Sequence, residues 1–472
     1  MKKTRGQQIF FPQKQRQIDF SINLLFPEDL IELIVNETNL NAEQKQRAAG
    51  RQDQNWTPVN GTDIRAYFGI RILQGIKTLP SERHFWSRNK YLHVKKVSDT
   101  MTRNRYLKIN EYLHFNDATT AVPRGHKGHD KRHQIRPLIE RLTETFSAEY
   151  KPNKENAIDE GLIKFKGRLE FRQYMPLKPA KHGIKVWLRA DSVSHFVCQF
   201  DVYTGRPNRG QEHGLGERVV KELSRDLANG NYHLYFDNFF SCFKLMKDHL
   251  GDNIYATATT RANRKDFPQP LKKAKLNRGE SISMQRNGVT ACSWQDKKKV
   301  NFLTTNCQPT GDDTVLRREK DGTQEVLNTP PCVVAYNKFM GGVDYADQKR
   351  NEYRIPVKSR SWYRYLAFFL FETAIVNAYI LRQLSPNHGD ITQLDFRLEL
   401  LDKLIGNYSS RKRKRASTDI EVLDGKSHFP IRVTLNRCVY CASRNQRHCS
   451  TWGCVLCDVT LCVSCFEPFH TR

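Results

Sequence analysis

Two glycines and two aspartates stand close together in the segment YNKFMGGVDYADQ, residues 336–348. Asp344 and Asp347 are three positions apart, a spacing that puts both carboxylates on one face of a helix. Paired glycines before a helix indicate that another part of the chain approaches the backbone closely. An isolated pair of this kind is more typical of a solvated helix face than of a catalytic site, so its meaning depends on whether other acids join it.

Two further aspartates stand where apolar runs predict strands. Asp159 lies inside NAIDEGLIKF (156–165), and Asp237 directly follows the apolar residues of NYHLYFDNFF (231–240). These runs are typical of half-buried strands, so one acid marks the inside of a strand and the other marks the end of one. Glu160 neighbours Asp159 but points to the opposite face of its strand, so it does not join the same group.

The chain around these acids divides into a helical part and a part that alternates strands and helices. Helical spacing of apolar residues predicts amphipathic helices within residues 1–117, a loop at 118–133 and a further helix up to residue 150. From residue 156 the period changes to that of strands. Strands are predicted at 156–165, 184–191, 195–203, 231–240 and 253–260, and helices at 216–228 and 241–250.

This order, β-β-β-α-β-α-β followed by an insert and a helix, is that of an RNase H-like fold. In that architecture the first and fourth strands lie side by side, and the helix after the fifth strand crosses both. We therefore expect Asp159, Asp237, Asp344 and Asp347 to converge. Carboxylates within a few ångströms of one another repel, so such a cluster is stable chiefly around a divalent cation. Two Mg²⁺ or Mn²⁺ ions about 3.5–4 Å apart can clamp the attacking and leaving oxygens of a phosphodiester.

The charge balance favours a nucleic-acid partner. The chain carries 77 Lys and Arg against 50 Asp and Glu, a formal net charge of +27, and this surplus points to a polyanion with nucleic acid ahead of membrane. Basic residues interleaved with aromatics follow the first predicted strand, and they suit backbone phosphates and unpaired bases. Lysines that protect an edge strand are the alternative for some of them. The candidate DNA contacts are Lys164, Lys166, Arg168, Arg172, Lys178, Lys181 and Lys185.

Neither a signal peptide nor a membrane span is expected. The most apolar segment, 362–381, is long enough to cross a bilayer, but Arg364, Glu372 and Asn377 lie in its body and predict a buried core helix instead. A polar segment with RKRKR at 411–415 predicts a flexible linker that serves nuclear import or DNA contact. We therefore expect a soluble protein located in the nucleus.

Seven of the 12 cysteines fall in the last 35 residues. Three CxxC pairs have the spacing of tetrahedral zinc sites, which favours metal over disulfides in a chain without a secretory signal. A segment of about 40 residues buries too little core to fold alone, so metal would supply its folding energy. Two interleaved Zn²⁺ ions are expected, with Cys449 as the eighth ligand and His448 as the open alternative. The expected ligands are Cys438, Cys441, Cys449, Cys454, Cys457, Cys462, Cys465 and His470.

Several long motifs resemble those of piggyBac-family transposases. They are IDEGLIKFKGRLEFRQYMPLKPAKHGIK, FDNFFS, YNKFMGGVDYADQ, WQDKKKVNFLTT and the helical lead-in WTPVNGTDIRAYFGIRILQGI, and the resemblance covers nearly the whole chain. It implies a cut-and-paste DNA transposase with a DDD site at Asp159, Asp237, Asp344 and Asp347. Such enzymes nick 3′ ends, form and resolve hairpins, and integrate at TTAA targets.

The resemblance also implies partners. It suggests a homodimer, a zinc module that recognises terminal inverted repeats, and a position near the active site for the helix that begins at Trp362. Trp362 is therefore a further candidate DNA contact, with a position in the core as the alternative. Zinc cross-brace modules elsewhere bind chromatin proteins, so that partner stays open. A domesticated derivative that binds DNA or chromatin without transposition is the alternative to an active enzyme, and the intact acids favour the enzyme.

The expected architecture is an α/β, RNase H-like catalytic core with an insertion domain, a mainly helical N-terminal domain and a small C-terminal zinc-binding domain. The boundaries follow the composition and the elements. They are 1–130 for the helical dimerisation and DNA-binding domain, 131–262 and 331–405 for the catalytic domain, 263–330 for the insertion domain, 406–430 for the basic linker and 431–472 for the zinc-binding domain.

Overall fold

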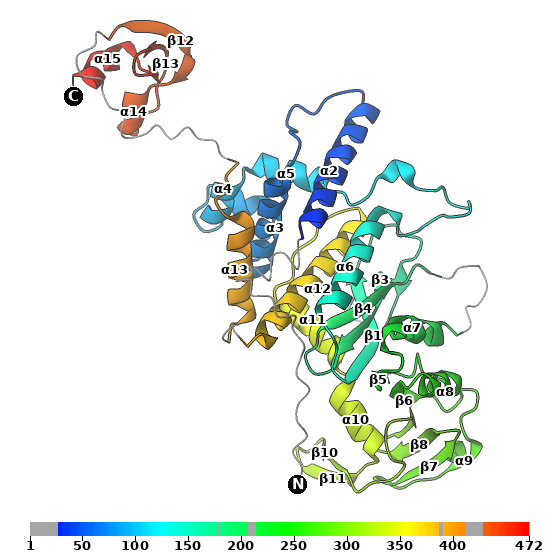
Figure 1. Ribbon diagram of the computed structural model, residues 1–472. Coiled ribbons are helices and arrows are strands. Elements are labelled where there is room, and N and C mark those ends of the chain that lie inside the picture. Colours follow the sequence, from blue (N-terminus) through cyan, green and yellow to red (C-terminus); the bar gives the residue numbers. More distant parts are fainter. Residues whose placement is uncertain (1–26, 177–179, 206–213, 387–389, 411–427, 472) are drawn as a thin grey trace. The chain divides into compact units, whose positions relative to one another are not determined.

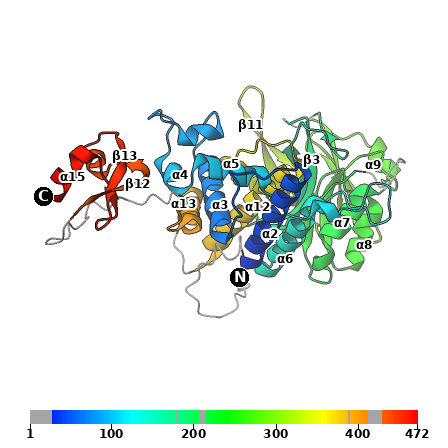
Figure 2. The same ribbon diagram turned by 90° about the horizontal axis from the view of Figure 1, so that it is seen from above.

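The computed structural model describes residues 27–176, 180–205, 214–386, 390–410 and 428–471 (Figures 1 and 2). The chain forms two compact units, Met1–Tyr408 and Ser409–Arg472. The predicted nuclear-import pentamer at 411–415 and most of the predicted linker lie outside the described residues.

The N-terminal part of the first unit is helical, as the apolar periodicity predicts. Its helices are α2 (Glu28–Ala48), α3 (Gly61–Ile76), α4 (Lys95–Thr100), α5 (Arg103–Tyr112) and α6 (Arg136–Glu149). In Figure 1 α2 to α5 lie at one end of the unit and the strands from residue 281 onward lie at the other, while α6 lies beside the strands between them.

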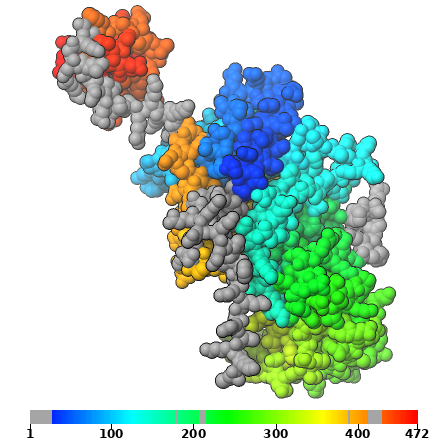
Figure 3. All heavy atoms as spheres, viewed as in Figure 1, coloured from blue at the N-terminus to red at the C-terminus, as the bar shows by residue number. Residues whose placement is uncertain are grey.

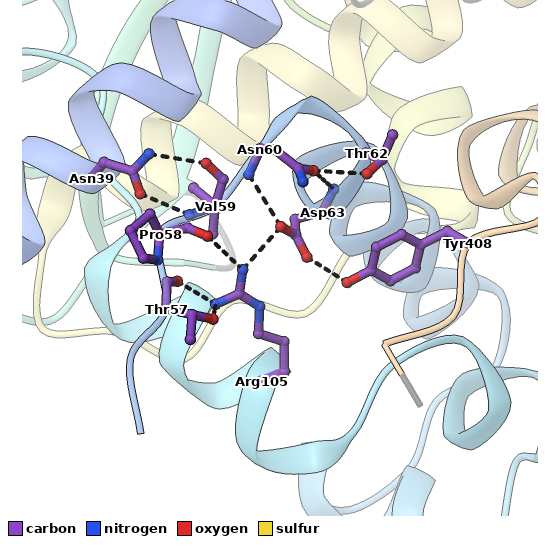
Figure 4. A network of polar contacts seen from close by, with 9 residues as sticks. All are labelled: Asn39, Thr57, Pro58, Val59, Asn60, Thr62, Asp63, Arg105 and Tyr408. Atoms are coloured by element: carbon purple, nitrogen blue, oxygen red, sulfur yellow. Dashed lines mark hydrogen bonds and ion pairs between the residues drawn. The ribbon is translucent and has the colours of Figure 1, made fainter. Parts of the chain in front are cut away.

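A polar network fixes the start of α3 (Figure 4). The Asn60 side chain accepts a hydrogen bond from the Asp63 backbone at 3.0 Å, and the Asp63 carboxylate accepts one from the Asn60 backbone at 3.1 Å, which together form a capping box. Arg105 of α5 donates to Asp63 at 2.9 Å, and the Tyr408 hydroxyl donates to the same carboxylate. The network therefore ties α3 to α5 and to the last residue of the unit.

The central sheet supplies the strands that carry the acids. They are β1 (Glu155–Lys164), β2 (Gln173–Tyr174), β3 (His182–Asp191), β4 (Val197–Val202), β5 (His233–Phe236) and β6 (Tyr255–Thr260). β1 pairs antiparallel with β3, and β3 pairs antiparallel with β2 and β4. On its other side β1 pairs in parallel with β5, and β5 pairs in parallel with β6. The order β4-β3-β1-β5-β6 thus places the first and fourth predicted strands next to each other.

The segment predicted as an insertion domain joins this sheet instead of forming a separate unit. β9 (Lys299–Thr304) pairs antiparallel with β6, and β8 (Val289–Gln295) and β7 (Ser281–Arg286) follow it, so the sheet has nine strands. β6 would otherwise be an open edge, which a folded protein has reason to cover. β10 (Thr314–Arg318) and β11 (Gln324–Asn328) form their own two-stranded sheet.

Helices cover both faces of the sheet. α7 (Leu215–Leu223) and α8 (Phe243–Gly251) share a core with Ile158 and Trp187. On the other face, Ile163 and Ile184 belong to the large core that includes α12 (Trp362–Leu384). Because side chains alternate along β1, the residues with odd numbers, including Asp159, face the α12 side. The remaining helices of this part are α9 (Gln269–Lys273), α10 (Pro331–Phe339) and α11 (Gly342–Glu352).

α12 is long and apolar enough to span a membrane by composition, yet 94% of its most apolar window is buried inside the structure. Its polar residues find partners there, since Arg364 donates to the backbone carbonyls of Glu111 and Leu113 at the end of α5 and Asn377 bonds the backbone of Val197. α12 is therefore packed as a core helix, as its internal charges predict.

α13 (Gln393–Ile405) packs against α3, and in Figure 3 the orange surface of α13 adjoins blue N-terminal residues. The approach is close, because a Cβ added at Gly69 would lie 2.7 Å from Cγ1 of Ile405. The N-terminal helices therefore share one core with the C-terminal end of this unit.

The second unit is small. It contains a three-stranded sheet in the order β12-β13-β14 and two short helices around a core that includes Cys438 and Leu461. The elements are β12 (Pro430–Arg437), α14 (Val439–Ser443), β13 (Cys449–Cys454), β14 (Val459–Thr460) and α15 (Val463–His470).

The paired glycines of the GGVD segment differ in what surrounds them, and this leads to a testable prediction. A Cβ on Gly342 would lie 3.2 Å from Cβ of Ala157 and 3.2 Å from Cα of Ser192, whereas a Cβ on Gly341 would meet only the movable ring of Tyr345. We expect Gly342→Val to lower the free energy of unfolding by about 1–3 kcal/mol through overpacking of α11 on β1. Denaturant unfolding would measure this, with Gly341→Ala as the control; equal effects of the two variants would contradict it.

Candidate active site and metal centres

The parallel pairing of β1 and β5 brings two of the predicted acids together. Ile158 is opposite Phe236 in the ladder, so Asp159 and Asp237 are the next residues on two adjacent strands. Beyond this point β5 ends and the chain turns, with the Phe239 N–H donating to the Asp237 carboxylate at 2.7 Å. Arg264 holds the same turn, because it donates to the carbonyl oxygens of Asn238 and Phe239 at 2.8 and 2.7 Å.

α11 carries the other two acids, Asp344 and Asp347, and crosses β1 next to Asp159. Gly342 at its start lies against Ala157 of β1, on the strand face that Asp159 shares. The hydroxyl of Ser192 donates to the Phe339 carbonyl at 2.6 Å and fixes the junction between α10 and α11. Asp344 follows in the first turn of α11 and is exposed.

Three of the acids lie near the hydroxyl of Tyr336 in α10. Burial and, to a lesser degree, three nearby carboxylates raise the pKa of its hydroxyl to about 12. These carboxylates belong to Asp237, Asp159 and Asp344. The Tyr336 ring packs edge-on against Phe302 of β9 at 5.6 Å, so the phenol is held beside the acids in its neutral form. Sequence reasoning did not single out this residue, because a tyrosine in an amphipathic helix carries no signal of its own.

Asp347 has a different surrounding. Its Oδ1 accepts a hydrogen bond from Arg350 at 2.8 Å, and the Arg350 guanidinium also lies 3.9 Å from the carboxylate of Glu372 in α12. Asp347, Arg350 and Glu372 line a pocket of about 370 Å³ together with Glu160 and Lys164. The predicted fourth acid therefore stands on the same helix as Asp344 but is already paired with a cation.

The donor set at this place fits a hard divalent cation. Asp159, Asp237 and Asp344 offer only carboxylate oxygens, the ligands that Mg²⁺ and Mn²⁺ prefer. The acids come from two strand positions fixed by backbone pairing and from the first turn of one helix, so their separation is set by the fold. Such an arrangement can hold divalent ions against a phosphodiester.

The predicted DNA contacts fall into two groups. Five of them are exposed on and after β1, namely Lys164, Lys166, Arg168, Arg172 and Lys181. Lys185 is engaged inside the fold, since its amine lies 3.8 Å from the ring centroid of Trp187 and 3.8 Å from Glu160. Trp362 packs edge-on against Phe171 at 5.2 Å, which is the core role left open for it. Lys178 lies outside the described residues.

Four cysteines gather in the second unit with the spacing of a zinc site. Cys438, Cys441, Cys462 and Cys465 have ligand atoms that all lie within 4.8 Å of one another. The Sγ of Cys441 is 3.7 Å from that of Cys462 and 3.4 Å from that of Cys465. A tetrahedral zinc ion with Zn–S bonds of about 2.3 Å separates its sulfurs by roughly 3.7 Å, whereas a disulfide needs about 2.05 Å. The geometry therefore fits zinc.

The second group combines two cysteines with two histidines: His428, Cys454, Cys457 and His470. The Nδ1 atom of His428 is 3.4 Å from the sulfurs of both cysteines, and the Nε2 atom of His470 is 3.6 Å from that of Cys457. The ligands of the two groups alternate along the chain, which is the interleaved arrangement that the spacing predicts.

The eighth ligand differs from the sequence-based choice. Cys449 is exposed at the start of β13, and the exposed His448 contributes only its carbonyl oxygen, to the Cys438 backbone. Neither belongs to either group, and His428 takes the place instead. It was missed because it stands ten positions before the first CxxC pair, in a segment interpreted as linker; the pairing of β12 with β13 brings it back to Cys454. The zinc module thus begins by His428, earlier than the predicted boundary at 431.

Comparison with known proteins supplies the family context. Residues 22–379 match the family model described as Transposase IS4. The human PiggyBac transposable element-derived protein 3 is 27% identical over 96% of this chain and 76% of its own length, and the human PiggyBac transposable element-derived protein 2 is 26% identical over 95% and 75%. A cryo-EM structure of the piggyBac transposase synaptic complex with hairpin DNA has the same fold, with a TM-score of 0.72, 24% identity and coverage of 94% of this chain and 96% of that one.

The two metal groups predict a zinc content that depends on specific residues. The purified protein is expected to hold two Zn²⁺ ions, and His428→Ala is expected to reduce the tightly bound content toward one, because the second group would lose a ligand. Metal analysis after dialysis against a weak chelator would measure this. Cys449→Ser is the matched control and should keep both ions; loss of zinc from the control but not from His428→Ala would contradict the assignment.

Proposed function

The chain belongs to the piggyBac transposable element-derived family of IS4-type DDE transposases, and from this premise we propose that it is a cut-and-paste DNA transposase. The observation that carries the proposal is the register of β1 and β5, which delivers Asp159 and Asp237 side by side beneath the helix of Asp344. A protein that only bound DNA would have no need of acids that repel one another.

The strand order supports the finer assignment to an RNase H-like core. On one side of β1 the strands β3 and β4 continue an antiparallel meander, and on the other side β5 and β6 run parallel to β1. These five strands form the core, and the helix after the insert crosses it. In this proposal Asp159, Asp237 and Asp344 hold divalent ions, with Asp347 beside them. Bound Mg²⁺ or Mn²⁺ would lower the pKa of an attacking water or 3′-hydroxyl and stabilise the departing oxygen.

The proposed substrate is double-stranded DNA with the ends of a mobile element. The related piggyBac structure is named as a synaptic complex with hairpin DNA, so we propose hairpin formation and resolution, TTAA integration and a dimer on DNA for this chain as well. The exposed side chains of Lys164, Lys166, Arg168, Arg172 and Lys181 could bind the phosphates of a DNA strand whose scissile bond lies at the acids. We propose that the protein acts in the nucleus, because its proposed substrate is DNA, the two relatives named above are human, and the basic pentamer at 411–415 is typical of nuclear import signals.

A domesticated derivative is the second candidate. The human relatives are named as transposable element-derived proteins, and such a protein would keep the DNA contacts and zinc module while serving the host. The zinc module would then bind chromatin proteins, whereas in a working transposase it would bind terminal inverted repeats. The complete set of aspartates favours the transposase.

Substitution of Asp237 distinguishes a catalytic transposase from a protein that only binds DNA. We expect Asp237→Asn to lower the rate of strand nicking by more than about a hundredfold, because even groups that merely orient a metal ligand are worth 10–100-fold. DNA binding should remain, since the substitution keeps the size of the side chain. An excision assay with Mg²⁺, using DNA that flanks this protein's own gene as the ends, would measure both.

The matched control is Asp201→Asn, a carboxylate of the same sheet that pairs with Arg132 at 2.7 Å, away from the site. It should nick at close to the wild-type rate. Loss of nicking and of DNA binding together in Asp237→Asn would count against a catalytic role. Binding without nicking by the wild-type protein would favour the domesticated derivative.

A further inference from the structure

Helix α12 contains an acid that its surroundings do not favour. Glu372 lies in the middle of this apolar helix, and only 3% of its side chain is exposed. Burying a carboxylate costs several kcal/mol unless cations and hydrogen bonds compensate for the lost water. Its partners are the backbone N–H of Ile355 and the guanidinium of Arg350. Apolar residues often stabilise such a buried position as well as an ion pair does, so the acid indicates a role beyond packing.

Arg350 connects this buried acid to the candidate active site. Its Nη2 donates to Asp347 at 2.8 Å, its Nη1 lies 3.9 Å from Glu372, and its side chain is 8% exposed. The guanidinium also stacks on the ring of Phe369, 4.1 Å from the ring centroid. The planar guanidinium is thus contacted by Asp347, Glu372 and Phe369, and its hydrogen bond restricts the orientation of the Asp347 carboxylate.

Glu372 and Arg350 depend on each other. Burial raises the pKa of Glu372 to about 7, and among the influences that lower it the charge of Arg350 is the largest. Arg397 and Arg354 act on the same carboxylate more weakly. The arginine that bonds Asp347 therefore also favours the ionised form of Glu372, and the Glu372 carboxylate in turn holds the arginine beside it.

We propose that Glu372 and Arg350 are positioning residues that hold Asp347 ready for the divalent metal of the active site. The proposal rests on the proposed function, because it assigns these residues to the metal site of the transposase. Arg350 bonds Oδ1 of Asp347. Oδ2 of the same carboxylate then remains available to a metal, as in sites where an outer partner orients a ligand. Arg350 stands one turn after Asp347, so the pair moves as one with α11.

The test uses the full-length, zinc-loaded protein and Mn²⁺ as the probe, with binding measured by electron paramagnetic resonance in the absence of DNA. Glu372→Gln keeps the acceptor for the Ile355 N–H but removes the charge, and Arg350→Lys keeps the charge but removes the fork. Both are expected to weaken Mn²⁺ binding about tenfold, within the range known for outer partners of metal ligands. Asp347→Asn should weaken it at least as much, and adding Arg350→Lys to it should have no further effect.

The matched control is Arg364→Lys, at a buried arginine of α12 that donates to backbone carbonyls at the end of α5. It is expected to lower the thermal midpoint without changing Mn²⁺ affinity. Wild-type affinity in both folded variants, or additive effects with Asp347→Asn, would overturn the proposal, as would the absence of a Mn²⁺ site in the wild type. Because no turnover is needed, weakened Mn²⁺ binding in a protein that does not nick DNA would sustain the positioning role while the proposed function fails.

Discussion

The parallel hydrogen-bonded pairing of β1 with β5 is the interaction on which the candidate site depends. It sets Asp159 and Asp237 on neighbouring strands without the help of any side chain. The neighbouring elements are arranged around that pair. Gly342 presents no Cβ to β1 and so lets α11 cross it closely, and Arg264 restrains the turn after Asp237. β9 covers the far side of β6, so the strand of Asp237 lies well inside the sheet instead of near an edge.

Much of this arrangement is predictable from sequence, because strand order and carboxylate position follow from local periodicity. The order of the elements predicts that Asp159 and Asp237 follow paired residues of adjacent strands and that Asp344 lies on the helix after the insert, and the spacing of the CxxC pairs predicts zinc ligands. His428, Glu372 and Arg350 are not predictable in this way. Each acts through a partner that is distant in sequence or in another element, and its own neighbours resemble those of a linker or an amphipathic helix. Such residues are found only when tertiary contacts are known.

The insertion segment, residues 263–330, likewise has a position in the fold that could not be predicted from the sequence. The resemblance implies an insertion domain at 263–330, and β7, β8 and β9 of this segment continue the central sheet. Sequence periodicity indicates that strands exist, and it does not tell which edge they join. The free edge of β6 decides this, since backbone groups there need partners. The fold of the first unit is therefore more continuous than its sequence pattern indicates.

The second metal group contains the outermost ligands of the zinc module, His428 at its beginning and His470 at its end, whose rings lie 4.3 Å apart. One zinc ion would therefore be coordinated by residues from both ends of the module. Fraying from either terminus would have to break a bond to metal before any strand or helix could open. The module should then resist exopeptidases and mechanical pulling while metal is present, and lose that resistance all at once when the ion leaves.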